Sequence, residues 1–219
     1  MPLAAGDTDW GALPLLPMLA VFGASYLVGA FPTSYLAGRL VRGIDLREHG
    51  SRNLGATNVY RVLGWRTAIP VAAVDILKGA LPVWLFAPRV SDGTAFAMVC
   101  GAWAIAGHVW SLFVRFKGGK GVATAAGVFF AITPVAMSLS VALWAALVFL
   151  TGYVSLGSIT AASLFPVFVW WRYPAARSLV WVDVLVAAGI IWFHRANIGR
   201  LLNGTENRFG RRGAAAARG

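Results

Sequence analysis

The sequence has little charge and almost no cysteine. Only 12% of its 219 residues are charged, about half of the ~25% that is usual for soluble domains, so the chain lacks the side chains to coat a water-facing surface. The single cysteine, Cys100, lies in an apolar run and excludes an internal disulfide. The 58% share of hydrophobic residues and the mean hydropathy of +0.70 indicate an integral membrane protein.

Several kinds of catalytic motif are also missing. The chain has no Cys/His cluster for zinc, no paired carboxylates and no G-x-S-x-G nucleophile motif. Acidic loop residues that could hold Mg²⁺ are scarce, since the loops expected inside offer only Asp45, Glu48 and Glu206. We therefore expect no metal and no cofactor.

Long uncharged runs predict an all-α, polytopic membrane protein with seven transmembrane helices, because about 20 apolar residues cross a bilayer. The run 121–171 breaks at Thr133-Pro134 and at Thr151-Gly152 into three segments, the first of them short. The remaining spans are Gly11–Gly38, Thr67–Pro88, Gly93–Val114 and Ser178–Phe193. Residues 1–210 are expected to form one domain, and 211–219 a disordered basic tail.

The net charge of +11 is distributed unevenly between the connections. Seven crossings with the N-terminus outside and the C-terminus in the cytosol place nearly all Lys and Arg inside, as the positive-inside rule requires. The exceptions are Arg89, Arg172 and Arg177 outside and Lys78 within a span. If the short segment after Lys120 were re-entrant, the arginine-rich tail would lie outside, against the rule. The spread of basic residues over several loops argues against nucleic acid as a partner.

The first polar string, residues 45–61, lies on the expected cytosolic side. It places hydroxyl, amide and guanidinium groups among small residues that let the backbone approach a ligand. These candidates for binding an anion are Ser51, Asn53, Thr57, Asn58 and Arg61. A solvated, turn-rich loop is the alternative interpretation.

The second string, 116–124, holds Gly118, Gly119, Lys120 and Gly121 just before an expected helix. Exposed glycine amides, a helix N-terminus and a lysine are the components of a phosphate site. The string is not a Walker A motif, because Val114 and Gly121 occupy positions that need Gly and Ser or Thr. A flexible cytosolic turn is the alternative.

The third string combines the uncharged break 151–158, which contains Ser158, with residues 194–200. His194 and Asn197 are three residues apart and so share one helical face. Asp75 and Lys78 have the same spacing within a span and could pair with each other. His108 could orient the glycine loop, and core packing is an equal alternative. Asp183 has no evident partner.

Together these strings resemble the bacterial acyl-phosphate-dependent glycerol-3-phosphate acyltransferase family. The likeness runs from about Phe31 to Arg208 and rests on three ordered motifs. They are Gly50-Ser51-x-Asn53 to Arg61-x-x-Gly64, continued by Asp75-x-x-Lys78-Gly79; Gly107-His108 through Phe116-Lys-Gly-Gly-Lys-Gly-Val-Ala-Thr124; and Thr151-Gly-Tyr153, Ser158 and His194-x-x-Asn197-Ile-x-Arg200-Leu201 with Gly204-Thr-Glu206.

The resemblance implies a seven-helix enzyme of the bacterial inner membrane, active at the cytosolic face and without need of a metal. It would pass a fatty acyl group from acyl phosphate to the 1-hydroxyl of glycerol 3-phosphate, giving lysophosphatidate and phosphate. Membrane lipid surrounds it, and its apolar grooves would receive the acyl chain. By motif position, Ser51, Arg61, Lys120 and His194 are the essential polar set, the glycines of 118–121 bind glycerol phosphate, and Glu206 is structural. Asn197 joins the catalytic set.

One position departs from the family pattern: Arg52 stands where the family usually has glycine. Glycine reaches backbone angles that arginine reaches only at a cost, so we expect a local difference or an additional anion contact there.

Two other functions compete with this hypothesis. A transporter of a phosphorylated solute would need a polar path through the membrane and often has repeated halves. A lipid head-group phosphotransferase would need acidic residues for Mg²⁺. The dense polar strings gather on one face instead, which favours the acyltransferase.

Overall fold

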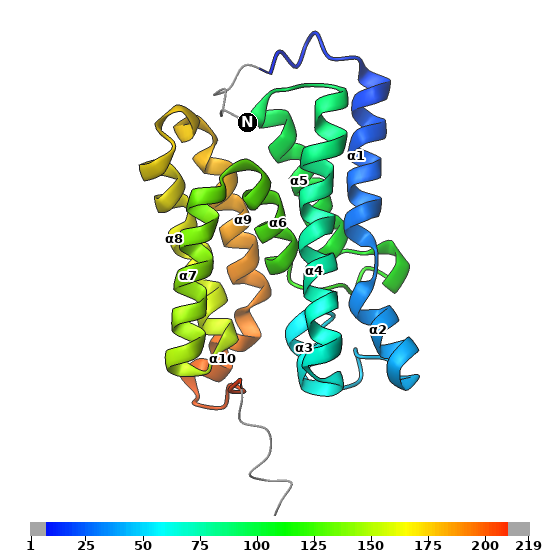
Figure 1. The fold of residues 1–219 in the computed structure, drawn as a ribbon, viewed down its shortest axis with the longest axis vertical. Helices are drawn as coiled ribbons and strands as arrows, with labels where there is room; N and C mark the ends of the chain where they lie inside the picture. The colour runs from blue at the N-terminus through cyan, green and yellow to red at the C-terminus, as the bar shows by residue number, and fades with distance from the viewer. Residues whose placement is uncertain (1–7, 210–219) are drawn as a thin grey trace, which may run out of the picture.

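The computed structural model describes residues 8–209, and within this range the protein is all-helical, as predicted. The helices are α1 Leu15–Ala30, α2 Thr33–Arg42, α3 Ala56–Leu63, α4 Trp65–Leu81, α5 Thr94–Val109, α6 Val122–Ile132, α7 Pro134–Thr151, α8 Val154–Arg172, α9 Val180–Phe193 and α10 Arg195–Leu202 (Figure 1). The predicted basic tail, 211–219, lies outside the described residues.

Five stretches are long and apolar enough to cross a membrane, and α9 with α10 makes a sixth if this pair, bent by 59°, is one span. The five are Leu15–Arg42, Trp65–Arg89, Thr94–Val114, Pro134–Thr151 and Val154–Arg172. The remaining predicted span corresponds to α6, whose 11 residues rise by only ~16 Å against a hydrocarbon core of ~30 Å. Seven spans, and the side on which each terminus lies, therefore stay predictions.

The predicted first span is not one continuous helix. It is broken between α1 and α2 at Phe31 and Pro32, where Phe31 has an extended backbone (φ −51°, ψ 120°). Proline has no N–H and disfavours a helical conformation in the residue before it. The break frees backbone carbonyls at this depth, and two of them receive partners: Ser111 Oγ donates to Ala30 O at 2.5 Å and Lys78 Nζ donates to Phe31 O at 3.1 Å.

Glycines bring two helix pairs into close contact. α4 and α6 meet at Gly79 and Gly127, where an added Cβ would lie 2.0 and 1.9 Å from a carbonyl oxygen of the facing helix. α1 and α5 meet in the same reciprocal way at Gly29 and Gly107. Small residues allow such approach between helices in lipid. These contacts fix the position of α6 and of the glycine loop that precedes it.

Figure 1 shows α2, α3 and α10 at one end of the molecule, while the connections α4–α5 and α8–α9 lie at the opposite end with the start of α1. The arginine-rich segments thus share one end, in agreement with the distribution predicted from charge. We call this the basic end.

Candidate active site

A cavity of about 1130 Å³ is lined by residues of α3, α4 and α6 on one side and of α7, α8 and α9 on the other. Near the basic end its lining is polar, and further along it is lined by apolar side chains such as Ile76, Phe129 and Phe165. The structure brings most of the sequence-predicted residues to this one cavity. Those that line it are Ser51, Asn53, Thr57, Asn58, Arg61, Lys120, Gly121, Ser158, His194, Asn197 and Glu206.

Glu206 is the centre of a hydrogen-bond network at the polar end. Its Oε1 accepts from Asn197 Nδ2 at 2.7 Å and from Ser155 Oγ at 2.9 Å, and its Oε2 accepts from Arg200 Nε at 2.6 Å. Lys120 Nζ donates to Asn197 Oδ1, which joins the glycine loop to α10. We call these five residues the Lys120 network. The sequence did not single out Ser155 and Arg200 as partners of Glu206, although both lie within the quoted strings.

The charges around Lys120 do not balance. Burial lowers the pKa of Lys120 to about 8; Glu206 opposes this, whereas Arg200 and Arg61 add to it. Burial also lowers the pKa of Arg61, although a guanidinium stays charged in proteins. Burial would raise the pKa of Glu206, but the hydrogen bonds from Asn197, Arg200 and Ser155 outweigh it and lower that pKa. The excess of positive charge over the one carboxylate suits a phosphate dianion.

His194 lies at the turn between α9 and α10 and is 4% exposed. Its Nδ1 is 2.7 Å from Ile190 O, and because a carbonyl only accepts, this nitrogen carries the proton. Burial, and then the charge of Lys120, lower the pKa of His194 to about 4. The imidazole is therefore neutral at physiological pH, with its lone pair on Nε2, as a general base requires. His194 and Asn197 both line the cavity, as their spacing predicted.

Asn58 holds the Ser51 loop in place. Its Oδ1 accepts from Ser51 N–H at 2.8 Å, and its Nδ2 donates to Leu46 O at 3.2 Å and to His49 O at 3.1 Å. The side chain is 1% exposed. Since both amide hydrogens are already donated to the backbone, we now expect Asn58 to position Ser51 instead of donating to a substrate.

Gly118 and Gly119 do not line the large cavity. Their amides donate to Val109 O at 3.0 Å and His108 O at 3.1 Å, so a phosphate could use them only in place of these bonds. A Cβ at Gly118 would lie 2.0 Å from His108 O, and one at Gly119 would lie 2.1 Å from His108 Nε2. In this structure close packing, not a free amide, accounts for these two glycines. Gly121 differs, because it lines the cavity with a φ of +80° at the start of α6.

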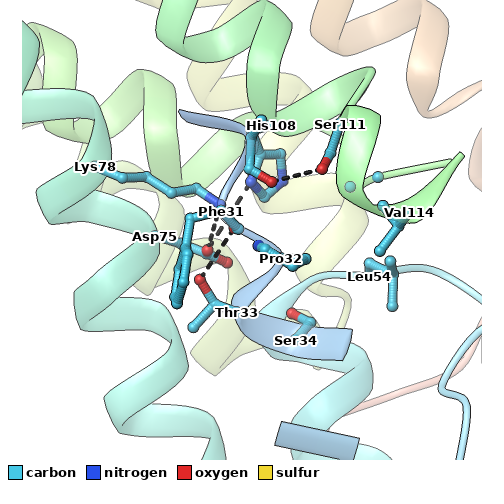
Figure 2. A pocket seen from close by; sticks show the side chains of 13 residues that line it. Phe31, Pro32, Thr33, Ser34, Leu54, Asp75, Lys78, His108, Ser111 and Val114 are labelled. Atoms are coloured by element: carbon cyan, nitrogen blue, oxygen red, sulfur yellow. Dashed lines mark hydrogen bonds and ion pairs between the residues drawn. The ribbon is translucent and has the colours of Figure 1, made fainter. Parts of the chain in front are cut away.

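A second group of buried charges lies beneath the glycine loop, and we call Asp75, Lys78 and His108 the anchor cluster (Figure 2). Lys78 Nζ is 2.8 Å from Asp75 Oδ1, which confirms the predicted pair, and His108 Nδ1 is 3.9 Å from the same oxygen. Figure 2 shows Lys78 reaching Phe31 at the α1–α2 break. Because Gly119 packs on His108, the cluster fixes the loop that carries Lys120. The sequence signal that could have revealed the freed Phe31 carbonyl is Pro32, because proline disfavours a helical conformation in the residue before it.

Arg52 adopts a left-handed backbone conformation, with φ +59°. This conformation explains why glycine suits the position. The side chain is exposed and lines the mouth of the cavity beside Ser51.

No group of three or more His, Cys, Asp or Glu side chains able to hold a metal occurs among residues 8–209. The expectation that no metal is required stays a prediction.

Residues 19–204 match the model of the family described as glycerol-3-phosphate acyltransferase. The glycerol-3-phosphate acyltransferase of Chlorobaculum parvum is 41% identical and covers 90% of this chain and 100% of its own length. The glycerol-3-phosphate acyltransferase of Desulforudis audaxviator is 44% identical and covers 89% of this chain and 96% of its own length.

Two solved structures share the fold. The crystal structure of PlsY (YgiH), an integral membrane glycerol 3-phosphate acyltransferase, in its glycerol 3-phosphate form has a TM-score of 0.82 and 37% identity, covering 88% of this chain and 96% of that one. The lysophosphatidic acid form of the same protein has a TM-score of 0.80 and 36% identity, and the match covers 88% of this chain and 95% of that one.

Proposed function

Because the chain belongs to the glycerol-3-phosphate acyltransferase family, we propose that it transfers a fatty acyl group from acyl phosphate to the 1-hydroxyl of sn-glycerol 3-phosphate. The products are 1-acylglycerol 3-phosphate (lysophosphatidate) and inorganic phosphate, and the reaction opens phospholipid synthesis. The observation that carries this proposal is one cavity with excess positive charge at one end and an apolar lining beyond it. Such a cavity suits a phosphate joined to a fatty chain.

Acyl phosphate is a mixed anhydride and needs no covalent enzyme nucleophile. The 1-hydroxyl oxygen attacks the acyl carbonyl carbon, the bond between that carbon and the phosphate oxygen breaks, and phosphate leaves with the electron pair. Arg61 and Lys120 offset the repulsion between the two phosphates, and Ser51 orients a substrate oxygen. Positioning of this kind lowers a barrier by ~7–11 kcal/mol in well-oriented cases.

The hydroxyl proton goes either to His194 Nε2 or to a phosphate oxygen of the donor. The neutral, buried His194, with Nδ1 tied to Ile190 O, is prepared for the first route. In a His194→Ala variant we expect turnover to fall by about 10²–10³ through loss of a general base. Full turnover with an unchanged pH profile would assign the proton to the phosphate.

We place the enzyme in the bacterial inner membrane with the basic end in the cytosol. The concentration of Arg and Lys at that end supports this orientation. Glycerol 3-phosphate then reaches Lys120 from water, while the fatty chain lies between the helices.

The test uses purified protein in detergent with palmitoyl phosphate and glycerol 3-phosphate, without added metal. Phosphate and lysophosphatidate are expected in equal amounts, and Lys120→Met is the matched inactive control. Turnover with palmitoyl-CoA alone would keep the reaction class and change the donor. No product with either donor, from protein shown to be folded, would overturn the enzyme and favour transport of a phosphorylated solute.

A further inference from the structure

Asp183 is a buried carboxylate that the proposed chemistry does not use. It belongs to the first turn of α9, is 2% exposed and lines the large cavity. Its Oδ2 has no hydrogen-bond partner in the described part of the chain. A buried polar atom without a partner is costly, so its presence beside an apolar passage calls for a reason.

Ser140 on α7 repeats this observation independently. It is 1% exposed, lines the same cavity, and its Oγ also has no partner among residues 8–209. α9 begins toward the end of the molecule opposite the basic end (Figure 1), and Asp183 lies in its first turn. Ser140 belongs to the first half of α7. Part of this region is packed and not open to the cavity. A hydrophobic cluster there includes side chains that do not line the cavity, namely Ile132, Ala136 and Val169.

The distance from the polar end to Asp183 can be measured along α9. Asp183 precedes His194 by 11 positions, which corresponds to ~16 Å at ~1.5 Å per residue. An extended chain with carbon–carbon bonds of about 1.5 Å advances ~1.3 Å per carbon. A fatty chain whose carbonyl is at His194 therefore reaches the level of Asp183 after about a dozen carbons.

We propose that Asp183, assisted by Ser140, sets the upper limit on the length of the acyl chain. This inference rests on the proposed function. Each methylene that enters the apolar part of the cavity leaves lipid or detergent and packs against apolar side chains, which favours binding through close contact. A methylene that reaches Asp183 instead packs against a carboxylate with an unpaired oxygen, to which it offers no hydrogen bond. The gain from lengthening the chain ends at that depth.

The experiment measures kcat/KM for acyl phosphates with 10, 12, 14, 16, 18 and 20 carbons. For the wild type, we expect kcat/KM to stop rising between the chains of 12 and 14 carbons. Asp183→Leu replaces the carboxylate by an apolar group, and we expect it to raise the ratio of kcat/KM for 18 carbons over 12 by about fivefold, because the chain then meets no unpaired polar atom. Asp183→Asn keeps the polarity and size and should leave the ratio within about twofold.

If Asp183→Leu does not fold, Ser140→Ala provides a second test. We expect it to raise the same ratio of kcat/KM by about twofold. An unchanged ratio in a folded, active Asp183→Leu variant would overturn the inference, as would a wild-type profile that keeps rising to 20 carbons. A wild type that uses no acyl phosphate of any length would instead refute the proposed function. The two failures are therefore distinguishable.

Discussion

The glycine loop connects two groups of buried charge that differ in their balance. In the anchor cluster, Asp75 and Lys78 neutralise each other and the remaining contact of Lys78 goes to a backbone carbonyl. In the Lys120 network the single carboxylate of Glu206 faces Lys120 and Arg200, with Arg61 close enough to act on the same lysine. Balanced charge thus holds helices together, whereas unbalanced charge leaves attraction for an anionic ligand.

The largest effect is expected from Lys78→Met. The change leaves Asp75 buried without its partner, which costs ~3–5 kcal/mol of unfolding free energy. Thermal unfolding in detergent would show it, with the reaction of a thiol dye at the buried Cys100 as the signal. The double variant Asp75→Leu/Lys78→Met should recover part of the loss. Wild-type stability in Lys78→Met would show that the cluster does not hold the fold.

The same substitution in the Lys120 network should act on catalysis. For Lys120→Met we expect kcat/KM for glycerol 3-phosphate to fall by about 10²–10³, the usual loss for one charge-stabilising donor. The unfolding temperature should hardly change, because the buried charge of Lys120 is itself disfavoured by burial and by the neighbouring Arg61 and Arg200. Destabilisation as large as in Lys78→Met would erase the distinction between the clusters.

The pH dependence of KM should report the charge of Lys120. Lys120, whose pKa is lowered to about 8, is protonated below that pH and neutral above it. Measured above pH 7, where the substrate phosphate is a dianion, KM for glycerol 3-phosphate should stay constant up to about pH 8 and then rise by up to about tenfold per pH unit.

Glu206 supplies the control for this profile, because its charge raises the pKa of Lys120. In Glu206→Gln the rise in KM should therefore begin at a lower pH. A profile that is flat to pH 10 in the wild type would contradict the assignment of Lys120 to phosphate.

The smallest effect concerns backbone strain beside the site. Arg52 has a φ of +59°, a conformation that costs an L-residue ~1–2 kcal/mol. Arg52→Gly removes this cost but loosens the unfolded chain, so we expect stability to rise by ~0.5–1 kcal/mol. The difference in unfolding free energy between the wild type and Arg52→Gly would measure this gain. Arg52→Ala is the matched control, because alanine keeps the backbone strain. An equal gain in Arg52→Ala would show that loss of the arginine charge, and not relief of backbone strain, stabilises the protein.

The residues selected from the sequence as a site lie together in space, whereas their individual roles stay predictions. Ser51, Lys120 and His194 were selected from separate strings and line one cavity. The structure offers another explanation for two of the glycines, since the Gly118 and Gly119 amides bond to α5 carbonyls, and phosphate binding by them stays a prediction. Composition reveals that a glycine is present, but only the fold decides whether its missing side chain makes room for a ligand or for a neighbouring backbone.

The spans show the same division between local and tertiary information. Hydropathy found the long apolar helices, because transfer of side chains into lipid depends on local composition. It indicated that the segment of α6 is short, but it did not predict the break at Pro32 as the source of a carbonyl for Lys78. That contact depends on how α4 packs against the α1–α2 break.

The amino-acid sequence by itself determined that the chain is a helical membrane protein, that its basic residues gather at one end, and which strings carry the anion-binding groups. These properties follow from composition and order along the chain. Only the tertiary structure decided that Glu206 joins Lys120 through Asn197, that Lys78 also reaches the Phe31 carbonyl, and that Asp183 borders the cavity. The physical reason is that charge balance and burial depend on neighbours in space, which hydropathy and motif spacing do not encode.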